Sequence, residues 1–186
     1  MFADAYDPLP LKPGNFPGYG FEPGPANDLP GDADGLVIGL EPFDVFWRDG
    51  QRLVGAHMAE VGERPGMPFD LNVDLMQRLA AVGADHVITA RCNGRMVGYL
   101  ASIVAPSMEN AGLLVGTQTA FFVSPDFRGI GPRLQRASLA SLRALGVREV
   151  LFRVGTRGSG PKLGALYRRM GAQPFGQMFS LMLEET

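Results

Sequence analysis

The stretch from Val123 to Leu134 carries the chemistry that the chain shows most directly. It reads VSPDFRGIGPRL, so the end of a predicted strand, a glycine-containing turn and the start of a predicted helix follow one another at once. At such a junction the first N–H groups of the helix lack intrahelical partners, and the helix dipole adds positive charge. Glycines let an anion approach the backbone, and arginines add charge-assisted hydrogen bonds. The junction therefore predicts a pyrophosphate site formed by Arg128, Gly129, Ile130, Gly131, Pro132 and Arg133.

The charge distribution agrees with an anionic ligand in the second half of the chain. Residues 1–85 contain 14 acidic and 5 basic residues, whereas residues 128–169 contain nine Arg and one Lys against a single acid, Glu149. A basic segment of this kind attracts a polyanion, and nucleic acid and a phosphorylated cofactor are both candidates. The plain alternative is a solvated Arg-rich face on two helices, so charge alone does not identify the ligand.

Residues that could bind a metal or form a disulfide are few. The chain of 186 residues has one cysteine, Cys92, and two histidines, His57 and His86. An intramolecular disulfide, a cysteine-based zinc site and a multi-histidine metal site are therefore excluded. No apolar run reaches the roughly 20 residues that span a bilayer, and the first residues, MFADAYDPLPLKPG, do not resemble a signal peptide. We expect no metal, no membrane partner and a reducing cytosol.

Composition predicts one domain preceded by an extended arm. Residues 1–34 are dense in Pro and Gly, which predicts an arm without helix or strand, and residues 35–186 form the domain. The arm also contains Phe16, Tyr19 and Phe21, which are typical of a segment that lies on a surface of its own domain or of a partner. We therefore expect a protein partner, or self-association, through residues 1–34.

Hydrophobic periodicity predicts the elements that must position the junction. Helices are predicted over residues 41–61, 72–81, 132–145 and 161–170, with Gly50 weakening the first of them. Strands are predicted over residues 86–92, 95–104, 117–123, 148–154 and 175–183, and residues 62–68 form a loop. Asn93 and Gly94 predict a two-residue hairpin turn between the first two strands. This order of helices and strands predicts a mixed α/β fold.

Three motifs, in this order along the chain, resemble the GNAT family of acetyl-CoA-dependent N-acyltransferases. The hairpin NGRMVGY at residues 93–99 is similar to the family's Asp-Gly-x-Ile-Val-Gly turn. Arg128 to Gly131 resembles the start of the family's glycine loop, with Arg133 where a final Gly or Ala is expected. LGALYRRMGA at residues 163–172 resembles the Leu-Tyr-x-x-x-Gly-Phe segment. HMAE at residues 57–60 is similar to a subgroup of short GNAT-like proteins, many encoded by tailed phages.

The resemblance implies a fold, a cofactor and a reaction. The fold is a GNAT-type acyl-CoA N-acyltransferase fold, a mixed central sheet with helices on both faces, and the reaction is transfer of an acetyl or other acyl group from acetyl-CoA to an amine. Strands 117–123 and 148–154 would diverge to admit the cofactor. A backbone N–H near Phe122 or Val123 would polarise the thioester carbonyl. Tyr167 would protonate the departing thiolate.

The resemblance leaves the general base unassigned. The strand at residues 117–123 reads TQTAFFV and has no acid, whereas many family members carry Glu or Asp there. His57 and Glu60, three residues apart on one side of a helix, are the candidates for this role. Gln118 and Thr119 could orient a water molecule. A water wire or the loss of activity would explain the missing acid equally well.

Two other functions stay open beside the enzyme. The missing acid, the altered glycine loop and the arm also fit a weak or inactive GNAT-fold protein that acts by interaction, such as a phage assembly or virion component docking through its arm. A nucleic-acid binder would use the Arg-rich segment, although no aromatic residues interleave with these charges. For the enzyme we expect a small-molecule or protein amine as acceptor. We expect a cytoplasmic location, meaning the host cytoplasm or the virion for a phage protein.

Overall fold

The described residues belong to two units, of which the first ends at Arg153 and the second begins at Val154. The computed structural model describes residues 35–61, 69–154, 160–176, 181 and 183. The arm predicted at residues 1–34 and the loop predicted at residues 62–68 lie outside the described residues, so both stay predictions. The candidate site lies in the first unit, and the sheet of that unit determines its position.

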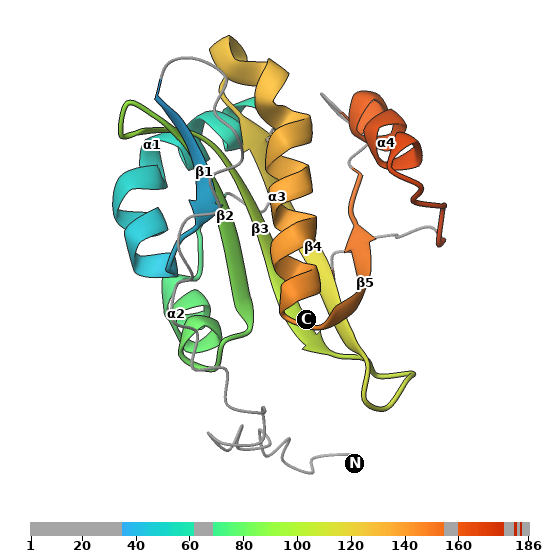
Figure 1. Ribbon diagram of the computed structural model, residues 1–186. Helices are drawn as coiled ribbons and strands as arrows, with labels where there is room; N and C mark the ends of the chain where they lie inside the picture. Colours follow the sequence, from blue (N-terminus) through green and yellow to red (C-terminus); the bar gives the residue numbers. More distant parts are fainter. Residues whose placement is uncertain (1–34, 62–68, 155–159, 177–180, 182, 184–186) are drawn as a thin grey trace. The chain divides into compact units, whose positions relative to one another are not determined.

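The first unit is built on one five-stranded sheet with the strand order β1-β2-β3-β4-β5 (Figure 1). Its strands are β1 (Leu36–Leu40), β2 (Asp85–Cys92), β3 (Arg95–Pro106), β4 (Leu114–Val123) and β5 (Val147–Phe152). The first four strands pair antiparallel, and β5 pairs parallel with β4. The parallel pair requires a crossover, which a 3₁₀ helix, η1 (Pro125–Ile130), and the helix α3 (Gly131–Ala144) provide. The sheet is therefore mixed, as predicted.

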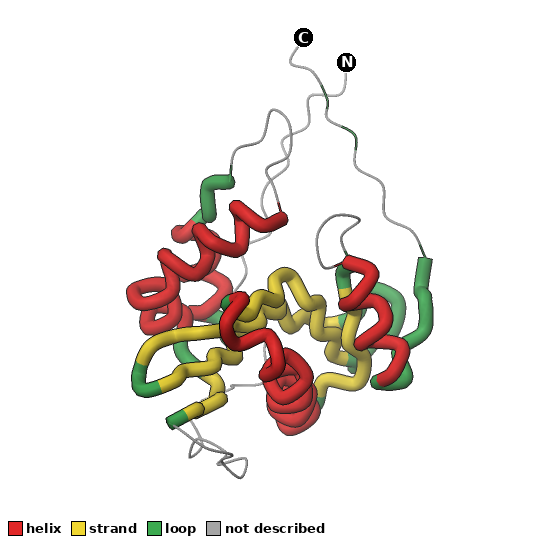
Figure 2. The backbone as a smooth tube through the Cα atoms, turned by 90° about the horizontal axis from the view of Figure 1, so that it is seen from above, coloured by secondary structure: helices red, strands yellow, loops and turns green. Residues whose placement is uncertain are grey.

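Helices cover both faces of this sheet (Figure 2). Helices α1 (Phe43–Val61) and α2 (Val73–Ala81) contact β2, and α1 also contacts β3, whereas α3 contacts all five strands. Alternate residues of a strand point to opposite faces. Accordingly, Tyr99 and Phe122 belong to the apolar cluster beneath α1, while Leu100 and Val123 belong to the cluster around Leu134 of α3. The core thus consists of two apolar layers, one on each side of the sheet.

Local signals explain where several elements begin and end. The side chain of Asn72 caps α2 by accepting a hydrogen bond from the N–H of Leu75 at 2.9 Å. Asn93 and Gly94 have φ values of 50° and 78°, which confirms the predicted hairpin turn between β2 and β3. Helix α1 runs through Gly50 without a break. A Cβ at that position would lie 3.1 Å from the ring of Phe46 and 3.3 Å from the sulfur of Met96 on β3. The missing side chain lets the helix pack closely on its own aromatic residue and on the sheet.

The structure corrects several predicted boundaries. Strand β1 was not predicted; it pairs with β2 from Leu36↔Cys92 to Leu40↔Ile88 and so forms one edge of the sheet. Strand β4 begins at Leu114 instead of residue 117, and β5 ends at Phe152 instead of residue 154. The strand predicted over residues 175–183 is absent at residues 175, 176, 181 and 183, and the rest of that range lies outside the described residues. Pairing with neighbours, which periodicity does not reveal, sets these limits.

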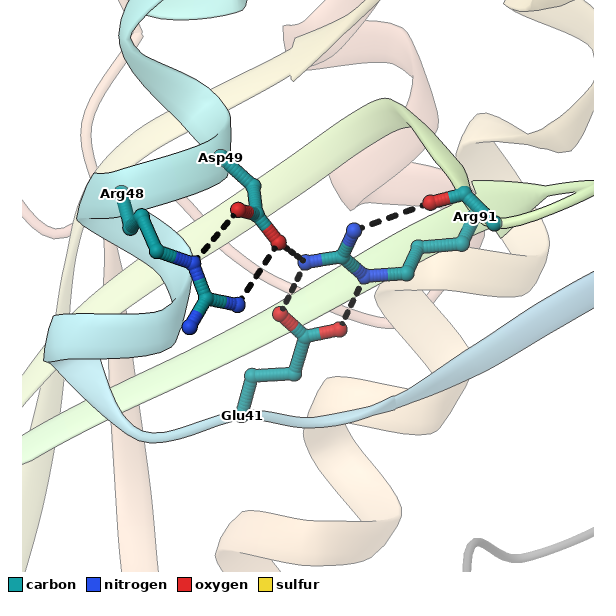
Figure 3. A network of polar contacts seen from close by, with 5 residues as sticks. Glu41, Arg48, Asp49 and Arg91 are labelled. Atoms are coloured by element: carbon teal, nitrogen blue, oxygen red, sulfur yellow. Dashed lines mark hydrogen bonds and ion pairs between the residues drawn. The ribbon is translucent and has the colours of Figure 1, made fainter.

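A network of charged side chains ties the start of α1 to β2 (Figure 3). The guanidinium of Arg91 donates to both oxygens of Glu41 at 2.6 and 2.8 Å and to Asp49 at 2.9 Å. Arg48 donates to the same Asp49 at 2.8 Å, and this bond lowers the pKa of that carboxyl to about 2. Two carboxylates therefore share one guanidinium, which fixes α1 relative to the sheet from its first turn onward.

The second unit contains one helix in its described part, α4 (Gly160–Arg169). Pro161 lies in its first turn, as predicted, where its missing N–H removes no helical hydrogen bond. Gly171 has a φ of 91° and donates to the carbonyl of Arg168 at 3.0 Å, while Ala172 donates to the carbonyl of Tyr167 at 3.0 Å. A glycine-terminated helix end of this kind matches the predicted stop.

Candidate functional site

Strands β4 and β5 run side by side for only part of their length. Their parallel pairing extends from Leu114↔Val147 to Gln118↔Phe152. Strand β4 then continues to Val123, whereas β5 ends at Phe152. The second half of β4 therefore pairs with β3 alone among the described strands, and one edge of its backbone is not covered by β5. The pairing thus ends within the range in which the resemblance implied that these two strands diverge.

The direction of the backbone groups on this edge follows from the β3–β4 register. The N–H of Ser124 donates to the carbonyl of Val97 at 2.8 Å, in line with the pairs Gly98↔Val123 and Tyr99↔Phe122. Hydrogen bonds to one neighbouring strand alternate along an antiparallel strand. The N–H of Phe122 thus faces β3, and the N–H of Val123 faces the edge that β5 leaves uncovered. Of the two positions expected to polarise a carbonyl, Val123 has the suitable direction.

A bulge in β4 lies at the point where the two strands part. Ser102 pairs with Gln118 and Ala101 pairs with Ala120, so Thr119 has no Cα partner in β3. The Thr119 hydroxyl donates to the carbonyl of Ala101 at 3.2 Å. A residue inserted in this way bends its strand and increases the local twist. Gln118 is buried and accepts a hydrogen bond from Gln135 of α3 at 3.0 Å, so its side chain belongs to the core beside the bulge.

The junction between β4 and α3 is more helical than the sequence predicted. Instead of an open glycine turn, residues Pro125–Ile130 form the 3₁₀ helix η1, which runs directly into α3. Within it, Phe127 donates to the carbonyl of Ser124 at 2.9 Å and Gly131 donates to the carbonyl of Arg128. Part of the expected set of unpaired amides is thus already satisfied. Pro125 favours this outcome because its ring presets a helical φ.

The junction still offers room for a ligand at Gly129. A Cβ built on Gly129 would meet no atom within 4 Å, whereas one on Gly131 would approach the ring of Phe121 to 3.4 Å. Gly129 therefore lies toward open space and Gly131 packs on the sheet. Arg128 keeps 46% of its side chain exposed, and Arg133, in the first turn of α3, is half-buried. Positive charge, the N-terminus of a 14-residue helix and an unobstructed backbone position thus occur together.

Two predicted site residues, Glu60 and Arg128, come together in the structure. The Arg128 guanidinium donates to the carboxylate of Glu60, so the end of α1 is joined to η1 across 68 positions of sequence. The side chain of Glu60 is 29% exposed, so both partners remain in contact with solvent. Glu60 is a candidate general base and Arg128 a candidate phosphate ligand, and the ion pair brings these two candidates into contact.

A third predicted residue, His57, lies one turn earlier on α1 and is buried. Its Nδ1 lies 2.6 Å from the hydroxyl oxygen of Tyr99 on β3, and its ring stacks on Phe122 of β4 at 4.8 Å. Burial lowers the pKa of His57, and the negative charge of Glu60 partly opposes this effect. Burial raises the pKa of Tyr99. Both rings are therefore neutral at physiological pH.

Tyr99 is a residue of this site that no sequence motif indicates. It lies in the middle of a long apolar strand, and a buried tyrosine usually places its hydroxyl against a polar partner. The chain contains two histidines, and of these only His57 lies on a predicted helix, whereas His86 lies at the start of a predicted strand. His86 instead bonds to Ser141 of α3 at 2.9 Å and is 1% exposed.

The remaining predicted residues have separate locations. Tyr167 belongs to the second unit, where it lies on α4 and is buried. Cys92 is partly buried beside the apolar cluster that contains Ile88 and Leu134. Within the described residues, no three side chains of His, Cys, Asp or Glu gather as ligands for a metal ion. None of the helices in that part of the chain is long and apolar enough to cross a membrane.

Solved structures of acetyltransferases share the fold. An aminoglycoside acetyltransferase from an uncultured soil metagenomic sample, in complex with trehalose, matches with a TM-score of 0.63 and 18% identity over 80% of this chain and 97% of that one. The ribosomal-protein-alanine N-acetyltransferase of Brucella melitensis biovar Abortus 2308 matches with a TM-score of 0.63 and 16% identity over 80% and 99%. The glucosamine-6-phosphate N-acetyltransferase of Arabidopsis thaliana matches with a TM-score of 0.61 and 11% identity over 81% and 100%. These likenesses confirm the predicted GNAT-type fold.

The likeness is structural and does not extend to the sequence. No protein-family model and no curated protein matches the amino-acid sequence. At identities below one fifth, the shared fold does not carry a shared substrate, because one fold supports many chemistries. The activity must therefore be argued from the site itself.

Proposed function

We propose that the chain is an N-acyltransferase that moves an acetyl or other acyl group from acetyl-CoA to an amine. The observation that carries the proposal is the end of the β4–β5 pairing at Gln118, which leaves the N–H of Val123 on an edge that no described strand covers, near Arg128 and the start of α3. An acyl carrier with a phosphorylated end needs both features, a donor for its carbonyl and a cationic helix start for its phosphates.

The residues at the junction fit the phosphorylated part of acetyl-CoA. Arg128 is exposed enough to reach a phosphate, and the space at Gly129 admits an approaching group. The α3 dipole favours negative charge at the same place. Arg133, half-buried in the first turn of α3, adds a second guanidinium, while Ile130 and Pro132 shape the junction. When bound, acetyl-CoA supplies the acyl group in the activated form of a thioester.

The protein's own groups then have three tasks. The N–H of Val123 donates to the carbonyl oxygen as negative charge develops there, which is the effect of an oxyanion hole. Glu60, beside Arg128, takes a proton from the acceptor amine, directly or through water. In the proposal Tyr167 returns a proton to the thiolate, and His57, 8% exposed against Phe122, shapes the wall beside Glu60.

Calorimetric titration with acetyl-CoA and with desulfo-CoA, which lacks the thiol, tests the cofactor assignment. We expect micromolar binding by the wild type and a strong loss of affinity in Arg128→Glu. Arg136→Glu is the matched control, because Arg136 is exposed on α3, which follows η1 directly, and the charge change is equal. Equal affinities in both variants, or no binding by the wild type at millimolar CoA, would overturn the assignment.

An acceptor screen that follows release of free thiol tests the reaction. Structural neighbours include enzymes named for aminoglycosides, for a ribosomal protein alanine and for glucosamine-6-phosphate. Aminosugars and protein N-termini are therefore the first amines to screen. The carboxylate of Glu60 would attract a cationic amine to the same location.

Contacts that residues of the β4–α3 junction already make within the protein favour a second candidate function. Glu60 already occupies Arg128, and the hydrogen bonds within η1 satisfy amides that a phosphate would otherwise bind. Both features fit a GNAT-fold protein that acts by interaction, with residues 1–34 as its docking segment. Absence of CoA binding together with co-purification of a partner that is lost on deletion of residues 1–34 would favour this function over the enzyme.

A further inference from the structure

The pair formed by His57 and Tyr99 is buried and enclosed by aromatic rings. The hydroxyl of Tyr99 and Nδ1 of His57 are 2.6 Å apart, and the two residues are 2% and 8% exposed. Phe46 packs against the Tyr99 ring at 5.1 Å, and Phe122 stacks on the His57 ring at 4.8 Å. These apolar contacts prevent either ring from turning toward another partner.

Two protons must be placed on this neutral pair, one on the phenol and one on the imidazole. One proton lies in the hydrogen bond, and the other points elsewhere. If Nδ1–H donated to Tyr99, the phenol proton would need an acceptor deep in the core, and Tyr99 makes no other hydrogen bond with the described residues. If Tyr99 donates, the second proton sits on Nε2 of His57, the less buried residue of the two. A buried donor without a partner is costly, so the second arrangement is favoured.

We propose that Tyr99 is a positioning residue that donates its proton to Nδ1 of His57 and thereby holds the neutral imidazole as the Nε2–H tautomer. In this form the ring offers a hydrogen-bond donor and no lone pair. His57 is then not the general base, and proton removal from the amine falls to Glu60, three residues further along the helix. This last consequence rests on the proposed function, whereas the tautomer does not.

The charges around His57 agree with a neutral ring. Burial lowers the pKa of His57, and burial raises the pKa of Tyr99, so neither group ionises near pH 7. Glu60 is the charged group that acts on His57, and its effect opposes burial without exceeding it. The elements packed on the ring, β3 and β4, contribute Tyr99 and the uncharged Phe122.

Nitrogen-15 NMR of the full chain tests the tautomer directly. The chain has two histidines, so four ring nitrogens are observed and His86 serves as the internal reference. We expect Nδ1 of His57 to give the signal of an unprotonated nitrogen and Nε2 that of a protonated one. A protonated Nδ1 in the wild type would overturn the proposal, and this result needs no variant.

Tyr99→Phe gives a second readout that a purely structural role would not produce. A bond donated to Nδ1 stabilises the neutral ring, so its removal should raise the pKa of His57 toward the ordinary value. A bond donated by Nδ1 would stabilise the charged ring, and its removal would lower the pKa. The matched control is Ser141→Ala, which removes the partner of His86 and should leave His57 unchanged. A fall of the His57 pKa in Tyr99→Phe would refute the assignment.

The test of the His57 tautomer and the test of the proposed function can fail independently. If the Nε2–H tautomer is found while desulfo-CoA does not bind, the acyltransferase proposal fails and the role of Tyr99 stands. If desulfo-CoA binds while Nδ1 is protonated, the cofactor site stands and His57 returns as a candidate base.

Discussion

Replacing Glu60 by Gln should strengthen the binding of CoA, because the carboxylate competes with phosphate for Arg128. The substitution keeps the size of the side chain and removes its negative charge. Arg128 and Glu60 are 46% and 29% exposed, so solvent screens much of their attraction. Ion pairs with this exposure contribute about 0.2–1 kcal/mol. At 1.4 kcal/mol per factor of ten, a ligand that must break the pair loses about 1.4-fold to 5-fold in affinity. We expect Glu60→Gln to restore that factor.

A double-mutant cycle separates the ion pair from the general effect of charge. The dissociation constant of desulfo-CoA is measured by calorimetry in the wild type, Glu60→Gln, Arg128→Gln and the double variant. If the pair is the cause, Glu60→Gln tightens binding when Arg128 is present and has little effect when it is absent. Asp44→Asn, an equal change of charge at an exposed position of the same helix, is the control. Equal gains in both backgrounds, or an equal gain in the control, would refute the competition.

Three further predictions concern other parts of the chain. Tyr167→Phe should lower kcat by roughly 10²-fold or more, as expected for a lost proton donor, with an unchanged dissociation constant for CoA; full turnover would exclude the role. Burial lowers the pKa of His86 to about 4 from 6.5, so the unfolded chain binds the proton first, and the free energy of unfolding should fall as pH drops from 6.5 toward 4, by roughly 3 kcal/mol at most. Denaturant titrations at stepped pH should show a shallower decline in His86→Gln, and an equal slope would contradict the assignment. Leu134→Ala, at a position with 0% exposure between α3 and the sheet, should cost about 2–5 kcal/mol in the same titrations, whereas exposed Leu75→Ala should cost far less.

The parts of the fold that are predictable from the sequence are those with local causes. Asn72 caps a helix through a contact three residues away, and Asn93 and Gly94 turn a hairpin by their own backbone angles. Strand β1 has no such signal, because its five residues become a strand only through pairing with β2, some fifty positions later in the chain. The same reason explains the misplaced starts and ends of β4 and β5. Pairing between distant strands is decided by tertiary contacts and not by periodicity.

The candidate site likewise combines features with local causes and features that depend on distant residues. The residue types and their location near the end of β4 were predictable, since the strand, the glycines and Arg128 are consecutive in the sequence. Their partners were not, because Glu60 is 68 residues from Arg128 and His57 is 42 residues from Tyr99. The glycine turn was wrong in its geometry, since the prolines and the hydrogen bonds of η1 convert the turn into a 3₁₀ helix. A motif thus indicates which groups are present, and the fold decides what each of them contacts.

The ion pair also connects the proposed donor site with the proposed acceptor site. In the proposed reaction Arg128 would bind the acyl donor and Glu60 the acceptor amine, whereas in the structure the two side chains pair with each other. A phosphate that binds Arg128 weakens the hold of the guanidinium on Glu60, so the carboxylate becomes available to a cationic amine. A cationic amine that arrives first would instead compete with Arg128 for the carboxylate, which would leave the guanidinium available to phosphate. Each substrate thus improves the site for the other, and binding of the two should show positive coupling in both orders of addition.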